Sequence, residues 1–331
     1  MAIELPVAAG ESVAGPATLS PAIHTIELAK RYRTVTALAG LTMTVPRGEV
    51  FGFLGPNGAG KTTAVKLLVG LTRPTSGEGL VLGAPLGDLR ARRRIGYLPE
   101  LFRYQEWLSA REVLRLHCAL AGIPRERQAR EIGEALAMVG LAARADDRVG
   151  TFSKGMQQRL GLGVALLGRP ELVLLDEPTS ALDPVGRHDV REIIRDLKRR
   201  GTTVFLNSHL LTEVEHVCDR VAVIDHGRVI ALGALGELLG GAHSVRLRVT
   251  GLSGAGDAAL RRFGDVSYED GWYTVRGMAD DAVPDLIAEL VRLGGRVYAV
   301  EPRHQTLEER FLQLLGDAPD AATHHRAPDI A

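Results

Sequence analysis

The chain has 331 residues, of which 45% are hydrophobic and 24% charged, an ordinary composition for a globular protein. Its 40 basic residues balance its 40 acidic ones, so no overall basic field would attract nucleic acid or an anionic lipid surface. The only two cysteines, Cys118 and Cys218, lie far apart, which argues against a disulfide framework or a structural zinc site. No apolar run reaches the roughly 18 residues that a membrane-spanning helix needs.

Organised sequence is predicted to begin at Ile23. Residues 1–22 are rich in Ala, Gly, Ser and Pro, and we expect them to form a disordered extension. Strands are predicted over residues 23–28, 41–45 and 49–54, and the last of these is an apolar run that ends in a glycine-rich turn. Helical spacing of apolar residues then predicts a helix over 61–70.

The glycine-rich turn reads Gly55-Pro56-Asn57-Gly58-Ala59-Gly60-Lys61-Thr62, which matches the pattern G-x-x-x-x-G-K-[ST] in full. Glycine permits backbone angles that turn several N–H groups toward one anion, and the dipole of the following helix adds to this attraction. We predict that this loop, with Thr63, binds the triphosphate of ATP. Lys61 would reach the β- and γ-phosphates, and the Thr62 hydroxyl would bind Mg²⁺. The alternative is a glycine-rich turn with a surface lysine, which the flanking strand and helix disfavour.

Residues 101–165 are predicted to form a mostly helical subdomain. Ser109 is expected to begin one helix, since Glu112 stands in capping-box position. A later segment, Phe152-Ser153-Lys154-Gly155-Met156-Gln157, begins another helix, with Ser153 as a good N-cap and Gly155 permitting close backbone approach. The chain thus has two helix starts suited to phosphate. One nucleotide could use both if two subunits paired head to tail with twofold symmetry. The local alternative is an ordinary capped helix.

Two carboxylates follow the next apolar strand, over residues 172–175. Ligands of open parallel sheets lie beyond the carboxyl ends of the strands, so Asp176 and Glu177 are expected beside the phosphate loop. Successive strand side chains point in opposite directions, which predicts separate roles for the two residues. Asp176 suits Mg²⁺, and Glu177 suits polarising an attacking water. Alternatively, the two acids cap a turn before Pro178.

Strands and helices alternate up to about residue 240, which predicts a parallel sheet covered on both faces and closed by a hairpin of residues 221–224 and 229–232. The sequence from 242 to 316 has the strand and helix order β-α-β-β-α-β of ferredoxin-like domains, followed by one more amphipathic helix over 307–315. We therefore expect an ATPase domain over 23–240, an α+β accessory domain over 242–316 and a disordered tail over 317–331.

Taken together, residues 23–235 resemble the nucleotide-binding subunit of an ABC transporter. Gly55–Thr62 matches the Walker A loop, Leu172–Glu177 the Walker B strand, and Phe152–Gln157 resembles the LSGGQ signature. Ser180–Asp183 matches the D-loop and Asn207–His209 the switch histidine.

The resemblance implies roles for single residues. Ser153 and Gly155, with Gln157 in support, would contact the nucleotide held by the opposite subunit. Asp183 would communicate across the dimer. His209 would hydrogen-bond the γ-phosphate, and Tyr32 would stack on adenine.

Two departures from the family pattern concern the metal and the signature. Glu100 stands where the family usually has a glutamine that senses Mg²⁺ and couples to the membrane partner. Lys154 and Met156 replace the usual Gly and Gln of the signature. This variant form, with its C-terminal appendage, resembles bacterial exporter ATPases of the drug- and polysaccharide-export type.

The expected function is therefore that of an ATPase motor, a homodimer or a pair with a paralogous subunit. It would work at the cytoplasmic face of the membrane with a separate integral membrane permease. The alternatives are a soluble ABC protein acting on ribosomes or nucleic acid, and a non-hydrolysing regulatory module. A single cassette, zero net charge and an intact Glu177 and His209 argue against them.

Overall fold

The computed structural model describes residues 20–180, 182–239, 244–252, 254–278, 280–303 and 306–316. Most of the predicted N-terminal extension and all of the tail over 317–331 lie outside the described residues. Ala22, assigned to that extension, is fully buried and its N–H donates to the carbonyl of Val45 over 2.9 Å. The packed part of the chain therefore includes Ala22.

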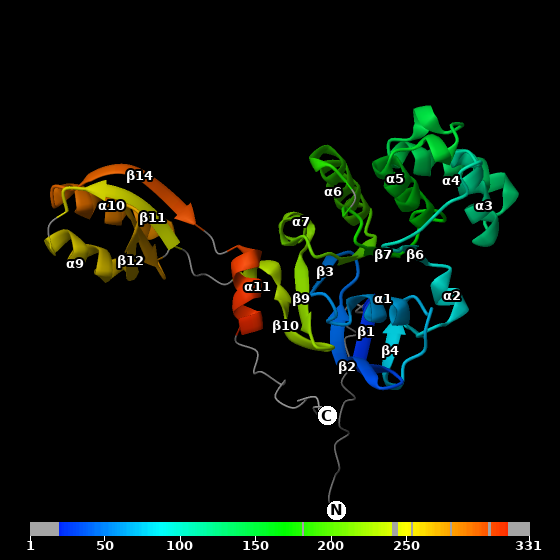
Figure 1. Cartoon of the computed structure of the whole chain (residues 1–331), viewed down its shortest axis with the longest axis horizontal. Helices are drawn as coiled ribbons and strands as arrows, with labels where there is room; N and C mark the ends of the chain where they lie inside the picture. The colour runs from blue at the N-terminus through cyan, green and yellow to red at the C-terminus, as the bar shows by residue number, and fades with distance from the viewer. Residues whose placement is uncertain are drawn as a thin grey trace, which may run out of the picture.

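A six-stranded sheet forms the centre of the larger part of the molecule (Figure 1), in the order β10-β9-β3-β8-β7-β6. Its strands are β3 (Val50–Leu54), β6 (Ile95–Leu98), β7 (Leu172–Asp176), β8 (Thr203–Asn207), β9 (Arg220–Asp225) and β10 (Arg228–Ala234). Neighbouring strands from β6 to β9 pair parallel, while β10 pairs antiparallel with β9. This confirms the predicted parallel sheet and its closing hairpin.

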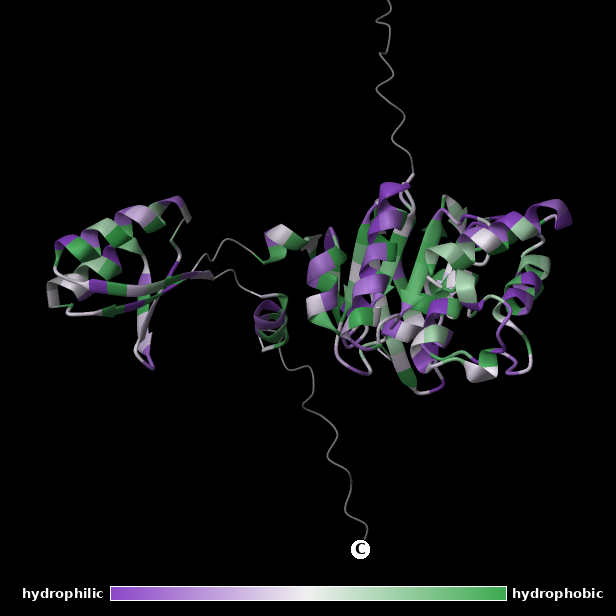
Figure 2. Ribbon diagram, turned by 90° about the horizontal axis from the view of Figure 1, so that it is seen from above, coloured by the Kyte–Doolittle hydropathy of each residue, from purple (hydrophilic) through white to green (hydrophobic). Residues whose placement is uncertain are grey.

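Both faces of this sheet are buried, because side chains of the central strands alternate between two cores. Phe51 and Phe53 of β3 pack with Phe205 of β8 on one face, with ring centroids 5.7 and 5.2 Å apart. Val50 and Leu54 of the same β3 strand belong to the other core. The strands are hydrophobic along their length in Figure 2. Burial on both faces explains their continuous apolar sequences.

A second, antiparallel sheet and several helices surround this centre. The sheet has the order β2-β1-β4-β5 and comprises β1 (Ile23–Tyr32), β2 (Val35–Val45), β4 (Ser76–Val81) and β5 (Ala84–Pro85). The surrounding helices are α1 (Lys61–Leu68), α2 (Leu89–Arg92), α6 (Pro184–Arg199), α7 (Leu211–Val217) and α8 (Leu235–Leu238). Of the described helices, none combines the length and apolarity needed to cross a membrane.

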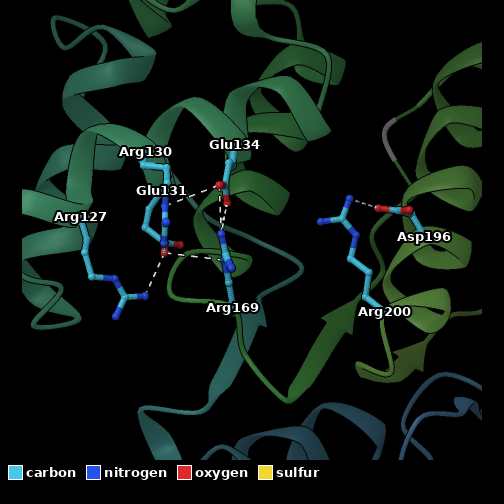
Figure 3. Close-up of polar contacts among 7 residues, drawn as sticks. All are labelled: Arg127, Arg130, Glu131, Glu134, Arg169, Asp196 and Arg200. Atoms are coloured by element: carbon cyan, nitrogen blue, oxygen red, sulfur yellow. Dashed lines mark hydrogen bonds and ion pairs between the residues drawn. The ribbon is translucent and has the colours of Figure 1, made fainter.

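The helical subdomain comprises α3 (Ala110–Leu120), α4 (Arg125–Met138), α5 (Lys154–Ala165) and the short turns η1 (Ala142–Arg144) and η2 (Val149–Thr151). The predicted capping box is confirmed, since Ser109 and Glu112 exchange their side-chain and backbone hydrogen bonds. Figure 3 shows how this subdomain is tied to the sheet: Arg169, just before β7, bonds Glu134 of α4 over 2.7 Å. The buried Glu131 lies 3.8 Å from the same guanidinium. These ion pairs join α4 to the turn that precedes β7.

A separate antiparallel sheet follows in the C-terminal part. It has the order β12-β13-β11-β14 and is built from β11 (Ser244–Thr250), α9 (Gly254–Phe263), β12 (Asp265–Glu269), β13 (Trp272–Arg276), η3 (Asp280–Ala282), α10 (Val283–Arg292) and β14 (Arg296–Arg303). The predicted order β-α-β-β-α-β is thereby confirmed. Figure 2 shows both helices on one face of the sheet, and Val245, Leu260 and Leu286 are buried in a core of its own between these layers.

The last helix, α11 (Leu307–Gly316), does not pack in that C-terminal core. Leu307 is 1% exposed and belongs to the large core that also contains Val214 and Val217 of α7, with Phe311 and Leu314 packed against it. Helix α11 lies within the range 242–316 predicted for the accessory domain, yet its apolar residues are buried together with those of α7.

Strands β4, β5 and β6, the second half of β1 and the first half of β2 have no counterpart among the predicted strands. Gly77 and Gly79 interrupt β4, so neither apolar alternation nor an apolar run marks it as a strand. Strand β6 has only four residues, and it is identified by its pairing with β7 rather than by its own pattern.

Candidate functional site

The candidate site lies where parallel strands end at one edge of the central sheet. The glycine-rich loop follows β3, Asp176 ends β7, Asn207 ends β8, and Glu100 follows β6 by two residues. Since these strands are parallel, their carboxyl ends lie at the same edge. Four segments that are distant in sequence are thereby brought together.

The loop between β3 and α1 depends on glycine at defined positions. Gly60 precedes α1 in the left-handed region, with φ of 103°, and Gly58 has φ of 83°. A Cβ atom on Gly60 would lie 2.3 Å from the carbonyl oxygen of Ala37, so only glycine fits. The loop is also held from outside, because Gly227 donates its N–H to the carbonyl of Ala59 over 2.9 Å.

Lys61, the first residue of α1, turns its side chain back over the loop. Its Nζ donates to the carbonyl oxygens of Gly55 and Pro56 over 2.7 and 3.1 Å. Burial lowers the pKa of the Lys61 ammonium, while the carboxylates of Glu177, Asp176 and Glu100 act in the opposite direction. The ammonium therefore lies between the loop carbonyl oxygens and these three carboxylates. A bound anion would compete with the carbonyl oxygens for it.

A cavity of about 440 Å³ opens over this loop. Its lining comprises Val35, Thr36, Ala37, Asn57, Gly58, Gly60, Lys61, Thr62, Thr63, Glu100, Glu177, Asn207 and His209. Six of the fourteen predicted nucleotide-binding residues, all from the loop and the start of α1, thus share this cavity with Glu100, Glu177 and His209. Tyr32 does not line it; the Tyr32 side chain is 44% exposed and lies 4.9 Å from the Nζ of Lys30.

Asp176 is 1% exposed and does not itself line the cavity, although its neighbour Glu177 and its partner Asn207 do. Asn207 donates from its side-chain amide to Asp176 Oδ1 over 2.5 Å. Burial raises the pKa of Asp176, and the hydrogen bond from Asn207 partly counteracts this rise. The Oδ1 atom of Asn207 is buried and has no hydrogen-bond partner among the described residues. Asn207 is therefore the structural partner of the metal-binding candidate.

No role was predicted for Asn207 from sequence, although a signal existed. It ends a fully buried apolar strand, β8, where a polar residue is unexpected unless it has a partner. The pairing of β8 with β7 identifies that partner as Asp176.

We expect Asn207→Ala to lower the free energy of unfolding by about 2 kcal/mol, because a buried carboxylate loses its amide donor. Chemical denaturation of the purified protein measures this. Asn57→Ala is the matched control, since Asn57 is exposed on the loop, and its effect should stay within about 0.5 kcal/mol. Equal losses in the two variants would contradict the structural role of Asn207.

Glu177 and His209 form a second pair, which faces the cavity. Nδ1 of His209 lies 2.7 Å from Oε2 of Glu177, and a carboxylate accepts, so the proton of this hydrogen bond belongs to the imidazole. The backbone of Glu177 has φ of 53°, uncommon for a residue other than glycine, and its N–H donates to the carbonyl of Asn207 over 2.9 Å. The strained backbone turns the carboxylate into the cavity.

The second predicted phosphate site lies in a different cavity, of about 470 Å³. Ser153, Gly155 and Asp183 all line it, together with Lys154 and Arg159, and it has no lining residue in common with the loop cavity. Ser153 caps α5 by accepting from the N–H of Met156 over 3.2 Å. Gln157 lines neither cavity, and its amide donates to the carbonyl of Phe152 over 3.4 Å.

The oxygen donors near the loop fit Mg²⁺. Thr62 and Glu100 line the cavity, and the buried Asp176 lies beside it. Across the described residues, no three carboxylate, imidazole or thiolate groups converge as a preformed metal cage. Mg²⁺ binds through one or two protein oxygens and completes its shell with water and phosphate, so this sparse donor set suits a metal that arrives with a nucleotide.

Comparisons with known proteins agree with this geometry. The sequence profile described as "ABC transporter" matches residues 38–180. An uncharacterized ABC transporter ATP-binding protein of Nostoc sp. is 43% identical over 304 residues, 88% of this chain and 89% of the relative. The daunorubicin/doxorubicin resistance ATP-binding protein of Streptomyces peucetius is 36% identical, and the match covers 93% of this chain and 97% of the relative.

The larger part of this chain has the same fold as a solved structure. This is a dimeric ATP-binding cassette in a post-hydrolysis state, bound to ADP and phosphate. It is 25% identical with a TM-score of 0.60, and the match covers 65% of this chain and 99% of that one.

Proposed function

The chain belongs to the ATP-binding proteins of ABC transporters, and we propose that its ATP hydrolysis drives export through a separate membrane permease. The protein binds and hydrolyses ATP, as its family does. The observation that carries the proposal is the single cavity in which the phosphate loop faces the Glu177–His209 pair.

The proposed mechanism assigns the chemistry to three side chains. Lys61 leaves the carbonyl oxygens of Gly55 and Pro56 and binds the β- and γ-phosphates. Glu177 accepts a proton from the water whose oxygen attacks the γ-phosphorus, and the bond from that phosphorus to the β,γ-bridging oxygen breaks, so that ADP leaves. His209 donates its Nδ1–H to Glu177 and, when its second ring nitrogen is also protonated, donates that N–H to the γ-phosphate. Thr62 and Asp176, with Glu100 nearby, would hold Mg²⁺, which would neutralise charge at the phosphate oxygens when bound.

We further propose that two subunits complete each site. The signature residues Ser153 and Gly155 lie with Asp183 in their own cavity, apart from the phosphate loop of the same chain. A head-to-tail dimer with twofold symmetry would bring this cavity onto the nucleotide of the other subunit. The dimeric cassette among the similar structures supports this arrangement.

The export role rests on the relatives. One is named as a daunorubicin/doxorubicin resistance ATP-binding protein and another as a linearmycin resistance ATP-binding protein, from Bacillus subtilis. We propose that this chain belongs to a similar export system and acts at the cytoplasmic face of the membrane, bound to a permease.

The packing suggests how the chain divides. We propose a cassette of residues 22–239 with α11 docked on it, and an accessory unit of residues 244–303. The separate core of the accessory unit supports this division, since Val245, Leu260 and Leu286 pack among its own elements.

Affinity purification from membranes of the source cells tests the transport role. The full-length protein should co-purify with a multi-spanning membrane protein, and antibody against that protein should recover the ATPase in return. ATP hydrolysis by the purified complex should exceed that of the isolated subunit. Recovery of ribosomes without a membrane partner would contradict the proposal.

A further inference from the structure

The helix α11 carries an apolar stripe that is buried away from the accessory unit. Leu307, Phe311 and Leu314 recur at helical spacing and pack against the large core of the cassette. The N–H of Leu307 lies 3.5 Å from Oε2 of Glu215, a residue of α7. In Figure 1, α11 lies beside the cassette, between it and the strands β11 and β14. Along the chain, α11 thus follows the last strand of the accessory unit and packs on the cassette.

The partner of α11 is the helix that directly follows His209. Only Leu210 separates His209 from α7, so the position of α7 sets the position of the histidine. Val214 of α7 is fully buried and touches β3, because a Cβ on Gly52 would lie 2.8 Å from its side chain. On another side, the buried Glu213 pairs with Arg191 of α6 over 3.6 Å. Helix α7 is thus held by β3, α6 and α11.

We propose that α11 acts as a brace on α7 and that Leu307 and Phe311 are positioning residues for the Glu177–His209 pair. This inference rests on the catalytic role proposed above for His209. The accessory unit, residues 244–303, is joined in sequence to α8 at one end and to α11 at the other.

The test compares two leucines of the same helix in the full-length protein. Leu307 is 1% exposed against the cassette, whereas Leu312 is 63% exposed. We expect Leu307→Ala to lower kcat about tenfold and to leave KM for ATP within about twofold, because the loop and Lys61 are untouched. Leu312→Ala should leave both constants unchanged, and Leu307→Met should restore most of kcat because it refills the same volume.

Amide hydrogen exchange separates bracing from general destabilisation. In Leu307→Ala, exchange should accelerate in α7 and in residues 208–210 but not in β7 or α1. Acceleration throughout the cassette, equal kinetic effects of the two alanine variants, or a kcat of Leu307→Ala within twofold of the wild type would each overturn the proposal. If the wild-type protein failed to hydrolyse ATP, the catalytic assignment would fail, while the exchange pattern would still decide whether α11 braces α7.

Discussion

Replacement of Glu177 by Gln is expected to reduce ATP hydrolysis by at least about a hundredfold while ATP binding persists. General-base catalysis contributes about 10²–10⁴-fold to such reactions, and an amide cannot accept the proton of the attacking water. The glutamine keeps the size of the side chain and the N–H bond to Asn207, so the turn with φ of 53° should survive. Phosphate release and equilibrium binding of a fluorescent ATP analogue measure the two quantities.

The same variant reports on the dimer. If hydrolysis separates two subunits that ATP has joined, Glu177→Gln should accumulate as an ATP-bound dimer in size-exclusion chromatography. Glu78→Gln is a suitable control, because Glu78 is exposed on β4 and lies outside both cavities. Undiminished hydrolysis in Glu177→Gln would remove the proposed base from the mechanism.

Replacement of Gly60 by Ala is expected to weaken ATP binding by more than about tenfold, since each 1.4 kcal/mol is a factor of ten and two penalties act together. The left-handed backbone costs a residue with a Cβ about 1–2 kcal/mol. In addition, the new methyl group would lie 2.3 Å from the backbone carbonyl oxygen of Ala37, so the loop or β2 must move. That movement displaces the N–H groups that would surround the phosphates. Isothermal titration with Mg-ATP measures the loss.

Gly58→Ala is the control that separates the clash with Ala37 from the cost of the left-handed backbone. Gly58 has a similar backbone, with φ of 83°, but nothing lies within 4 Å of an added Cβ. This variant bears only the strain, so its loss of affinity should be several times smaller than that of Gly60→Ala. Equal losses in the two variants would show that contact with Ala37 is unimportant for the loop.

Some features of the site could be predicted because their chemistry is contiguous in sequence. The phosphate loop, the acids after an apolar strand and the capping box of Ser109 and Glu112 each depend on neighbouring residues and local backbone angles. The loop pattern also places Asn57, Lys61 and Thr62 in one cavity, since all three lie within a single turn and the start of the helix that follows it.

Other features depend on strand pairing between distant segments. The contact of Glu177 with His209 and that of Asp176 with Asn207 both require β7 and β8 to lie parallel and in register. Apolar runs in the sequence indicate that strands exist but not which strand lies next to which. The sequence alone therefore predicted no role for Asn207, whose partner Asp176 is identified only by the pairing of β7 with β8.

The triphosphate-binding loop, the acids at a strand end and the C-terminal order βαββαβ could all be predicted from local sequence. The packing of distant segments, in contrast, places Ser153 and Asp183 in a cavity apart from the loop, and α11 on α7 instead of on the unit that precedes it. A local motif is specified by backbone conformation and short-range hydrogen bonds. The choice of packing partner depends on apolar surfaces whose complement lies elsewhere in the chain.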